Sequence, residues 1–198
     1  MRTYHKDLEH FERGRGYPER HDDLFKLIAD TWTCGSFLDV CCGSGLLGQR
    51  LIDKLGVMCC GIEADSVAAT AAHMLGVQMK IHEMLIQNNT LGLFSRVLVE
   101  HDVKTVVMRH CVNELFTDSG IPRPVNRLFA ASFVDTLVAR GVEEIYLEGR
   151  AFVSGPPRPI PNVAAEIEFF LPHYDVQVHR GRCVFLRRRR LETAKQAA

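Results

Sequence analysis

At 198 residues the chain has the length of one ordinary globular domain, and its 24 basic and 24 acidic residues balance to a net charge of zero. A zero net charge excludes the broad positive field that recruits nucleic acids or anionic membranes without specificity. No apolar run approaches the roughly 20 residues that span a membrane, and the polar, mixed-charge beginning of the chain is unlike a secretion signal. We therefore expect a cytoplasmic protein with no membrane partner.

The cysteines agree with a reducing compartment. Seven is an odd number and a poor disulfide framework, most of them lie in apolar runs typical of strands, and no C-x-x-C pair is present. Buried, reduced thiols are the expected state, and no metal centre is predicted.

Composition divides the chain into three segments. Residues 1–20 are rich in charged and aromatic side chains and are interrupted by glycines and a proline, so they predict an N-terminal arm, either poorly ordered or folded as a flap over a substrate. Residues 21–190 carry the patterns of one domain, and residues 191–198 form a small polar tail. The domain opens with a helix over residues 21–32, because apolar side chains recur there at three- and four-residue spacing.

The chain is organised around residues 37–48, FLDVCCGSGLLG. An apolar run with one acid, Asp39, predicts a strand over about 36–42, and a helix pattern follows the glycine turn over about 45–55. Glycine tolerates positive φ and lets a ligand approach the backbone, while a helix start offers free N–H groups and a positive dipole end. Strand, tight turn and helix in this order predict a nucleotide-like ligand.

Two interpretations fit this turn. Gly43, Gly45 and Gly48 match G-x-G-x-x-G, the dinucleotide fingerprint. The acid inside the strand favours the other: Asp-x-Cys-x-Gly-x-Gly resembles the first motif of the Rossmann-like (class I) S-adenosylmethionine (SAM)-dependent methyltransferases, an acid followed by glycines at every second position. Cys41 replaces the first glycine, a mild departure because cysteine is small. The resemblance implies that Asp39, Cys41, Gly43 and Gly45 line the cofactor site, near the cationic amino group of SAM.

The next unit adds a second acid. Residues 57–62 predict a buried parallel strand, and residues 66–75 predict a helix behind a Ser or Asp cap. Glu63 ends the strand, twenty residues after Gly43. A carboxylate there accepts hydrogen bonds from both ribose hydroxyls in NAD enzymes and SAM enzymes alike, so Glu63 supports the fold more than it selects the cofactor. The resemblance implies that Ala64 lies in the same site.

The third unit is less clear. Residues 77–85 predict a strand and residues 91–99 a helix. Related methyltransferases often carry an Asp near the end of this strand, in contact with the adenine amino group. The sequence here is His82-Glu83-Met84, so Glu83 is expected to replace that acid unless the adenine rests on apolar contacts alone.

A fourth strand, predicted over 105–108, leads into Arg109-His110-Cys111-Val112-Asn113-Glu114 at the carboxyl edge of the sheet. In the resembled family this edge faces the methyl donor and the acceptor. His110 is therefore a candidate general base, or a residue that only lines the methionine pocket. Asn113 and Glu114 are candidates for positioning the acceptor. Asn-Pro-Pro-Tyr, which marks methylation of a base amine, is absent, and so is the Pro-Cys pair of cytosine C5 chemistry.

The last third of the chain predicts a helix over 125–140 and a fifth strand over 142–147. A second helix over 162–171 follows a proline-rich loop, and residues 174–179 and 183–187 predict the two strands of a hairpin. The first of these helices is expected to bury Leu128, Phe129, Phe133 and Leu137. Methyltransferases of the resembled class end in such a hairpin, which an NAD domain does not require. The arginines at 187–190 either hold phosphate or form a solvated strand end.

Together the patterns predict an α/β fold, a doubly wound, mostly parallel seven-stranded sheet with a C-terminal antiparallel hairpin. The expected activity is methyl transfer from SAM to an unidentified acceptor, with a small molecule slightly favoured over nucleic acid and the oligomeric state left open. One alternative is an NAD(P)-dependent oxidoreductase, in which Tyr146 and Arg150 would only partly match the Tyr-x-x-x-Lys motif. The other is a SAM-binding protein that has no catalytic activity. His110 and Glu114 are the expected catalytic residues, and the expected cofactor contacts are Asp39, Cys41, Gly43, Gly45, Glu63, Ala64, Glu83 and His110.

Overall fold

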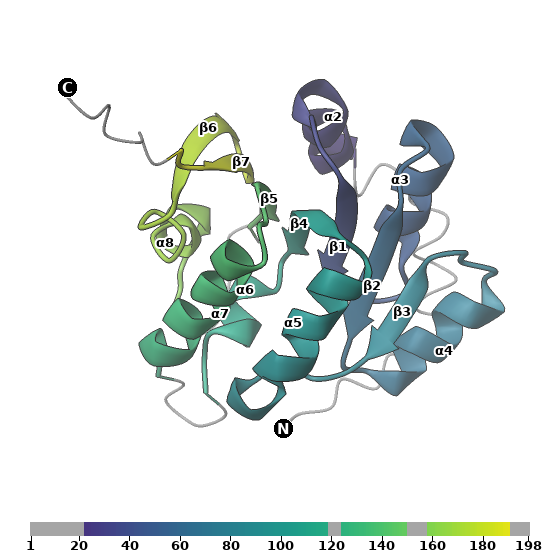
Figure 1. The fold of residues 1–198 in the computed structure, drawn as a ribbon, viewed down its shortest axis with the longest axis horizontal. Helices are drawn as coiled ribbons and strands as arrows, with labels where there is room; N and C mark the ends of the chain where they lie inside the picture. The colour runs from purple at the N-terminus through teal and green to yellow at the C-terminus, as the bar shows by residue number, and fades with distance from the viewer. Residues whose placement is uncertain (1–21, 119–123, 150–157, 191–198) are drawn as a thin grey trace, which may run out of the picture.

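The computed structural model describes residues 22–118, 124–149 and 158–190, which form one seven-stranded sheet with helices on both faces (Figure 1). The expected arm, the expected tail, Arg150 and the first part of the proline-rich loop lie outside the described residues. The strands are β1 (Ser36–Val40), β2 (Cys59–Glu63), β3 (Lys80–Glu83), β4 (Val103–Arg109), β5 (Glu144–Glu148), β6 (Tyr174–Arg180) and β7 (Cys183–Arg188). The helices are α2 (Asp22–Thr31), α3 (Leu46–Leu55), α4 (Ser66–Met74), the 3₁₀ turn η2 (Asn88–Thr90), α5 (Leu91–Glu100), α6 (Val112–Leu115), α7 (Arg127–Ala139) and α8 (Val163–Ile167).

The strand order is β3-β2-β1-β4-β5-β7-β6. Neighbouring strands from β3 to β5 are parallel, while β7 is antiparallel to both β5 and β6. The predicted doubly wound sheet with a closing antiparallel hairpin is therefore confirmed. The strand order reverses between β1 and β4, and open α/β sheets bind ligands beyond the carboxyl ends of the strands at such a point.

Successive side chains of each strand point to opposite faces, so the sheet supports two cores. On one face Leu38, Val106 and Ile145 join a large apolar cluster with side chains of α5, α7 and α8. On the other face Phe37 and Tyr146 pack with α2 and α3. Burial on both faces explains why the parallel strands read as apolar runs in the sequence. Within the described residues, no helix is both long enough and apolar enough to cross a bilayer.

Most predicted elements agree with the structure to within about two residues, the boundary precision that helix and strand assignment allows. The third strand begins only at Lys80, because the chain is still leaving α4 before it. Gly76 is left-handed (φ 70°), and the Val77 N–H donates to the Ala72 carbonyl at 3.0 Å. Helix α8 is also shorter than expected: after Ile167 the chain tightens into turns, and the Phe170 N–H donates to the Ile167 carbonyl three residues back at 2.8 Å.

Two burial expectations are wrong. Helix α7 buries Phe129, Phe133 and Leu137, but Leu128 is 83% exposed. Adjacent residues of a helix differ by about 100° in direction, so Leu128 does not share the face of its neighbour. All seven cysteines are free thiols, yet Cys41 is exposed rather than buried.

Candidate functional site

The carboxyl ends of β1 to β5 form one edge of the sheet, and the predicted site residues lie along it. The parallel register aligns the strand ends through the pairs Val40–Ile62, Val40–Met108, Glu63–Glu83 and Arg109–Glu148. The glycine turn after β1, the acids that end β2 and β3, and His110 after β4 are thus brought together. Glu114 lies one short helix further on, in α6.

Every second residue of the turn after β1 has a left-handed backbone. The φ angles are 57° at Cys41, 58° at Gly43 and 73° at Gly45. This alternation explains why glycines recur at every second position of the motif. A side chain in that conformation costs about 1–2 kcal/mol, so the cysteine is a strained substitution. The expectation that its small size makes the departure mild is therefore wrong.

The three glycines of the turn have different surroundings. A Cβ added at Gly43 would meet nothing within 4 Å, so this position opens to space where a ligand can approach the backbone. A Cβ at Gly45 would lie 3.0 Å from Met79 Cε and 3.1 Å from Val77 Cγ1. At Gly48 it would overlap the Met79 sulfur. Gly45 and Gly48 therefore let α3 pack against the residues before β3, and Gly43 is the glycine best placed to face a ligand.

Glu63 holds the tip of β2 against the glycine turn. Its Oε2 accepts a hydrogen bond from the Gly43 N–H at 2.7 Å, and its Oε1 accepts from the N–H groups of Ala64 and Asp65 at 2.8 and 2.9 Å. A carboxylate offers about four acceptor positions, so one is left for a ligand hydroxyl. Contact with a ribose stays a prediction, as does the role of the exposed Glu83 at the end of β3.

Asp39 is an acid inside the sheet, with 2% of its surface exposed. Burial raises the pKa of its carboxyl to about 7, although the charge of Arg109 opposes this rise and that of Glu63 adds to it. Asp39 is therefore only partly ionised near neutrality. A cation bound beside it would favour the charged form.

Glu148, the last residue of β5, gathers three basic side chains. Its Oε2 accepts from Arg109 Nε at 2.7 Å, while its Oε1 lies 3.3 Å from His110 Nε2 and 3.6 Å from the Arg182 guanidinium. Burial raises the pKa of Glu148, but the hydrogen bond from His110 and the charge of Arg109 together outweigh it and hold the pKa below its usual range. Glu148 is thus a buried carboxylate that orients an imidazole.

The backbone at His110 is also strained. Its φ is 56°, and its N–H donates to the Glu148 carbonyl at 2.8 Å. Cys41 and His110 therefore both have a left-handed conformation, directly beyond β1 and β4, the two central strands. Non-glycine residues held in this conformation cluster at functional sites, because the surrounding structure must hold them there.

The two acceptor-positioning candidates differ. Glu114 is exposed and lies 3.8 Å from the Arg158 guanidinium. Asn113 is buried, and its Oδ1 accepts from the Ile160 N–H at 3.1 Å. Asn113 therefore ties α6 to the segment before α8, which is a structural role.

Glu148 and Arg182 were missed by sequence reasoning. Glu148 carries a readable signal, because it follows the apolar run Ile145–Leu147 as Glu63 follows β2. Arg182 carries none. It precedes β7, and only the antiparallel pairing of Cys183 with Glu148 brings it to this edge.

Two other sequence-based candidates have structural roles. Tyr146 is fully buried, with its ring stacked on Phe185 and its hydroxyl 3.1 Å from Thr31 Oγ1, so it does not face the carboxyl edge as an oxidoreductase tyrosine would. Three of the four arginines at 187–190 form ion pairs with neighbouring acids: Arg187–Glu144, Arg188–Glu143 and Arg189–Asp175. These pairs favour a strand end over a phosphate site.

No protein-family model matches the sequence, and no curated protein matches it either. Solved structures do. A SAM-dependent methyltransferase from Aquifex aeolicus is 16% identical with a TM-score of 0.51, covering 85% of this chain and 91% of that one. The ribosomal protein L11 methylase from Lactobacillus delbrueckii subsp. bulgaricus is 14% identical with a TM-score of 0.50, covering 86% and 80%. The bifunctional kinase-methyltransferase WbdD is 13% identical with a TM-score of 0.57; the match covers 87% of this chain but only 39% of WbdD.

At these identities the likeness concerns the fold. The chain has the class I SAM-dependent methyltransferase fold, as its strand order and closing hairpin also indicate.

Proposed function

We propose that this chain is a cytoplasmic SAM-dependent methyltransferase that acts on a small-molecule acceptor. The observation that carries the proposal is the adjacency of two unlike groups on one sheet edge. The glycine turn and the Glu63 carboxylate lie at the ends of β1 and β2. The His110 imidazole, next to the Glu148 carboxylate, lies at the ends of the neighbouring strands β4 and β5. The seven free thiols are consistent with a reducing compartment.

The residues over β1 and β2 fit SAM. SAM is cationic at its sulfonium and amino groups, and Asp39 and Glu63 supply two neighbouring carboxyls. The open space above Gly43 admits a ligand against the backbone, next to the start of α3. When bound, SAM would supply an electrophilic methyl group, which leaves this chain to position the acceptor and remove its proton.

His110 and Glu148 would perform the proton transfer. Glu148 Oε1 lies 3.3 Å from Nε2 of the imidazole, and a proton held on Nε2 beside this carboxylate would leave the Nδ1 lone pair to accept another. In the carboxylate–histidine pairs of hydrolases the acid fixes the tautomer and the orientation of the ring, and Glu148 would have the same role here. His110 would thus take a proton from an acceptor hydroxyl or amine.

The charge around Glu148 bears on the acceptor. Arg109, His110 and Arg182 face a single carboxylate, so the cluster has more basic groups than acidic ones. This excess favours an acceptor with an anionic group. A small anionic molecule satisfies it without the extended basic surface that nucleic acid requires, and the zero net charge of the chain agrees.

Calorimetry on the full chain with SAM, S-adenosylhomocysteine and NAD tests the cofactor. We expect the first two to bind and NAD not to bind. A methyl-release assay with anionic small molecules, RNA and DNA then tests the activity. Binding of NAD without SAM would overturn the proposal, turnover on nucleic acid alone would change the acceptor class, and SAM binding without turnover on any acceptor would point to a non-catalytic protein.

SAM affinity should fall by roughly fivefold between pH 7 and pH 6. The reason is that the pKa of Asp39 is about 7, and only its ionised form attracts the cationic cofactor. Calorimetry at the two pH values, with proton release followed in buffers of different ionisation enthalpy, measures the effect.

Asp39→Asn is the matched control for this pH dependence. It should bind SAM more weakly and show little dependence on pH in this range. The variant should still fold, because a buried carboxyl whose folded pKa exceeds its unfolded pKa costs stability as pH rises from about 4 to 7. A wild-type affinity that is flat from pH 6 to 7 would remove Asp39 from the cofactor site.

A further inference from the structure

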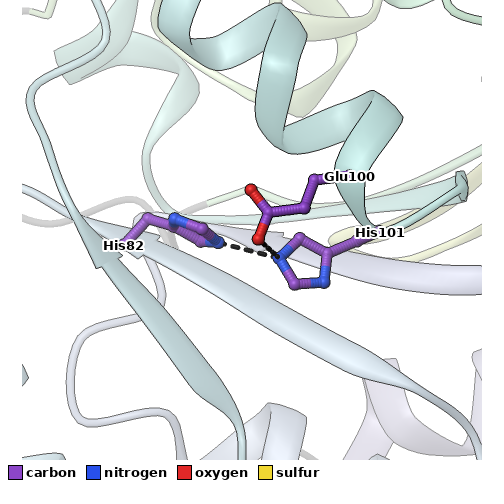
Figure 2. Close-up of side chains that lie close together, drawn as sticks. All are labelled: His82, Glu100 and His101. Carbon is purple, nitrogen blue, oxygen red and sulfur yellow. Dashed lines mark hydrogen bonds and ion pairs between the residues drawn. The ribbon is translucent and has the colours of Figure 1, made fainter.

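A cluster of metal-ligating side chains lies away from the residues described so far. It consists of His82 in β3, Glu100 at the end of α5, and His101 directly after it (Figure 2). Each contributes one ligating atom, and the three atoms lie within 4.8 Å of one another. Within the described residues, this is the only such group of three His, Cys, Asp or Glu side chains. None of the three residues takes part in the cofactor site or the Glu148 cluster.

The geometry is close to that of a coordination shell. Figure 2 shows the two imidazoles and the carboxylate converging, with Nε2 of His82 2.9 Å from Nε2 of His101 and Oε1 of Glu100 3.8 Å from Nε2 of His101. Two nitrogens bound to tetrahedral Zn²⁺ at about 2.0–2.1 Å lie about 3.3 Å apart. A bound ion would therefore open the first distance and close the second by about 0.4–0.5 Å each, a change that side-chain rotation supplies.

We propose that His82, Glu100 and His101 bind a divalent transition-metal ion, best suited to Zn²⁺. Two imidazoles and one carboxylate favour zinc and its neighbours over Mg²⁺ and Ca²⁺, which prefer oxygen ligands alone. Three protein ligands leave one position of a tetrahedron for water. That position is accessible, since the Glu100 side chain is 54% exposed and the His101 side chain 20%.

Lys80 competes with the ion. Its Nζ lies 2.5 Å from Glu100 Oε1, the same oxygen that faces His101. A metal ion must share or displace this ammonium group, and the like charge opposes its binding. Removal of the Lys80 charge should therefore tighten the site, which a casual contact of three side chains would not predict.

The ion would fasten an edge of the sheet. Strand β3 has four residues and, among the described strands, pairs only with β2. His101 belongs to the segment that leads from α5 into the central strand β4. A metal bridge between His82 and His101 would thus join the edge strand to the end of α5. An ion that binds only the folded chain raises the free energy of unfolding, by an amount that grows with the logarithm of the ion concentration above its Kd.

Zinc titration of the full chain, freed of metal with a chelator and without SAM, tests the proposal. We expect one Zn²⁺ per chain and a higher melting temperature with zinc. His82→Gln, Glu100→Gln and His101→Gln should each weaken binding by at least about tenfold, since loss of even an indirect partner of a metal ligand costs 10–100-fold. Lys80→Gln should tighten binding, and because it keeps all three ligands it tests the site even if a ligand variant unfolds.

His73→Gln, an exposed histidine at the end of α4, is the matched control and should bind zinc as the wild type does. Co²⁺ in place of Zn²⁺ reports the ligand type, since a thiolate ligand would add an intense charge-transfer band that imidazole and carboxylate ligands lack. Wild-type protein that binds no zinc, ligand variants that bind it equally well, or a thiolate band would each overturn the site. These readouts do not involve methyl transfer, so their outcome is independent of the proposed function.

Discussion

Replacement of His110 by alanine should lower methyl-transfer turnover by about 10²–10⁴-fold, the usual contribution of a general base, while SAM affinity stays within about tenfold. The imidazole lies on the β4 side of the edge, held by Glu148 at 3.3 Å, whereas the proposed cofactor contacts lie over β1 and β2. Single-turnover kinetics and SAM calorimetry on the same variant separate the two effects.

Glu148→Gln makes the expectation sharper. Glutamine keeps the size of the side chain and can still accept from Nε2–H, but it removes the charge that stabilises the protonated imidazole. Turnover should therefore fall, but less than in His110→Ala.

His173→Ala is the matched control, because His173 also faces a carboxylate, Asp135, at 3.2 Å. It precedes β6 at the opposite end of the strands, where Tyr174 pairs with Arg188. The His173→Ala variant should turn over as fast as the wild type. A His110→Ala enzyme with unchanged turnover would make the residue a bystander, and one that loses SAM binding alone would make it a pocket residue.

The sequence predicted the part of the site that strand order alone positions. Asp39 lies inside the first strand next to its end, while Glu63, Glu83 and His110 end or directly follow strands. Parallel strands place such residues at one edge whatever the details of packing. The sheet was predictable for the same reason, because buried parallel strands read as apolar runs and a hairpin follows them.

What the sequence could not predict depends on backbone conformation and on contacts between distant segments. The strain at Cys41 is a φ angle, which residue size does not indicate. Gly45 was expected to make room for a ligand, yet its missing side chain makes room for Met79, more than thirty residues later. The sequence did not indicate the proposed metal site, because His82 and His101 are 19 residues apart and meet only where β3 approaches the end of α5.

Glu63→Ala should weaken SAM binding by at least about tenfold, because a charge-assisted hydrogen bond to a ribose hydroxyl is worth about 1.5–3 kcal/mol. The structure adds a second reason for the loss. Glu63 also accepts from the N–H groups of Gly43 and Ala64, so the variant loosens the turn that faces the cofactor. Calorimetry measures the affinity, and the free energy of unfolding measures how far the turn is loosened.

Glu63→Gln separates the two contributions. Glutamine retains one oxygen for the backbone donors, but its amide nitrogen has no lone pair to offer a hydroxyl or an N–H. Glu143→Gln, an exposed acid directly before β5 at the other end of the strands, is the control for the loss of one carboxylate. We expect Glu63→Gln to lose most of the SAM affinity while its unfolding free energy falls less than that of Glu63→Ala. If Glu63→Gln binds SAM as tightly as the wild type, Glu63 serves the turn alone and the ribose must be held by other groups.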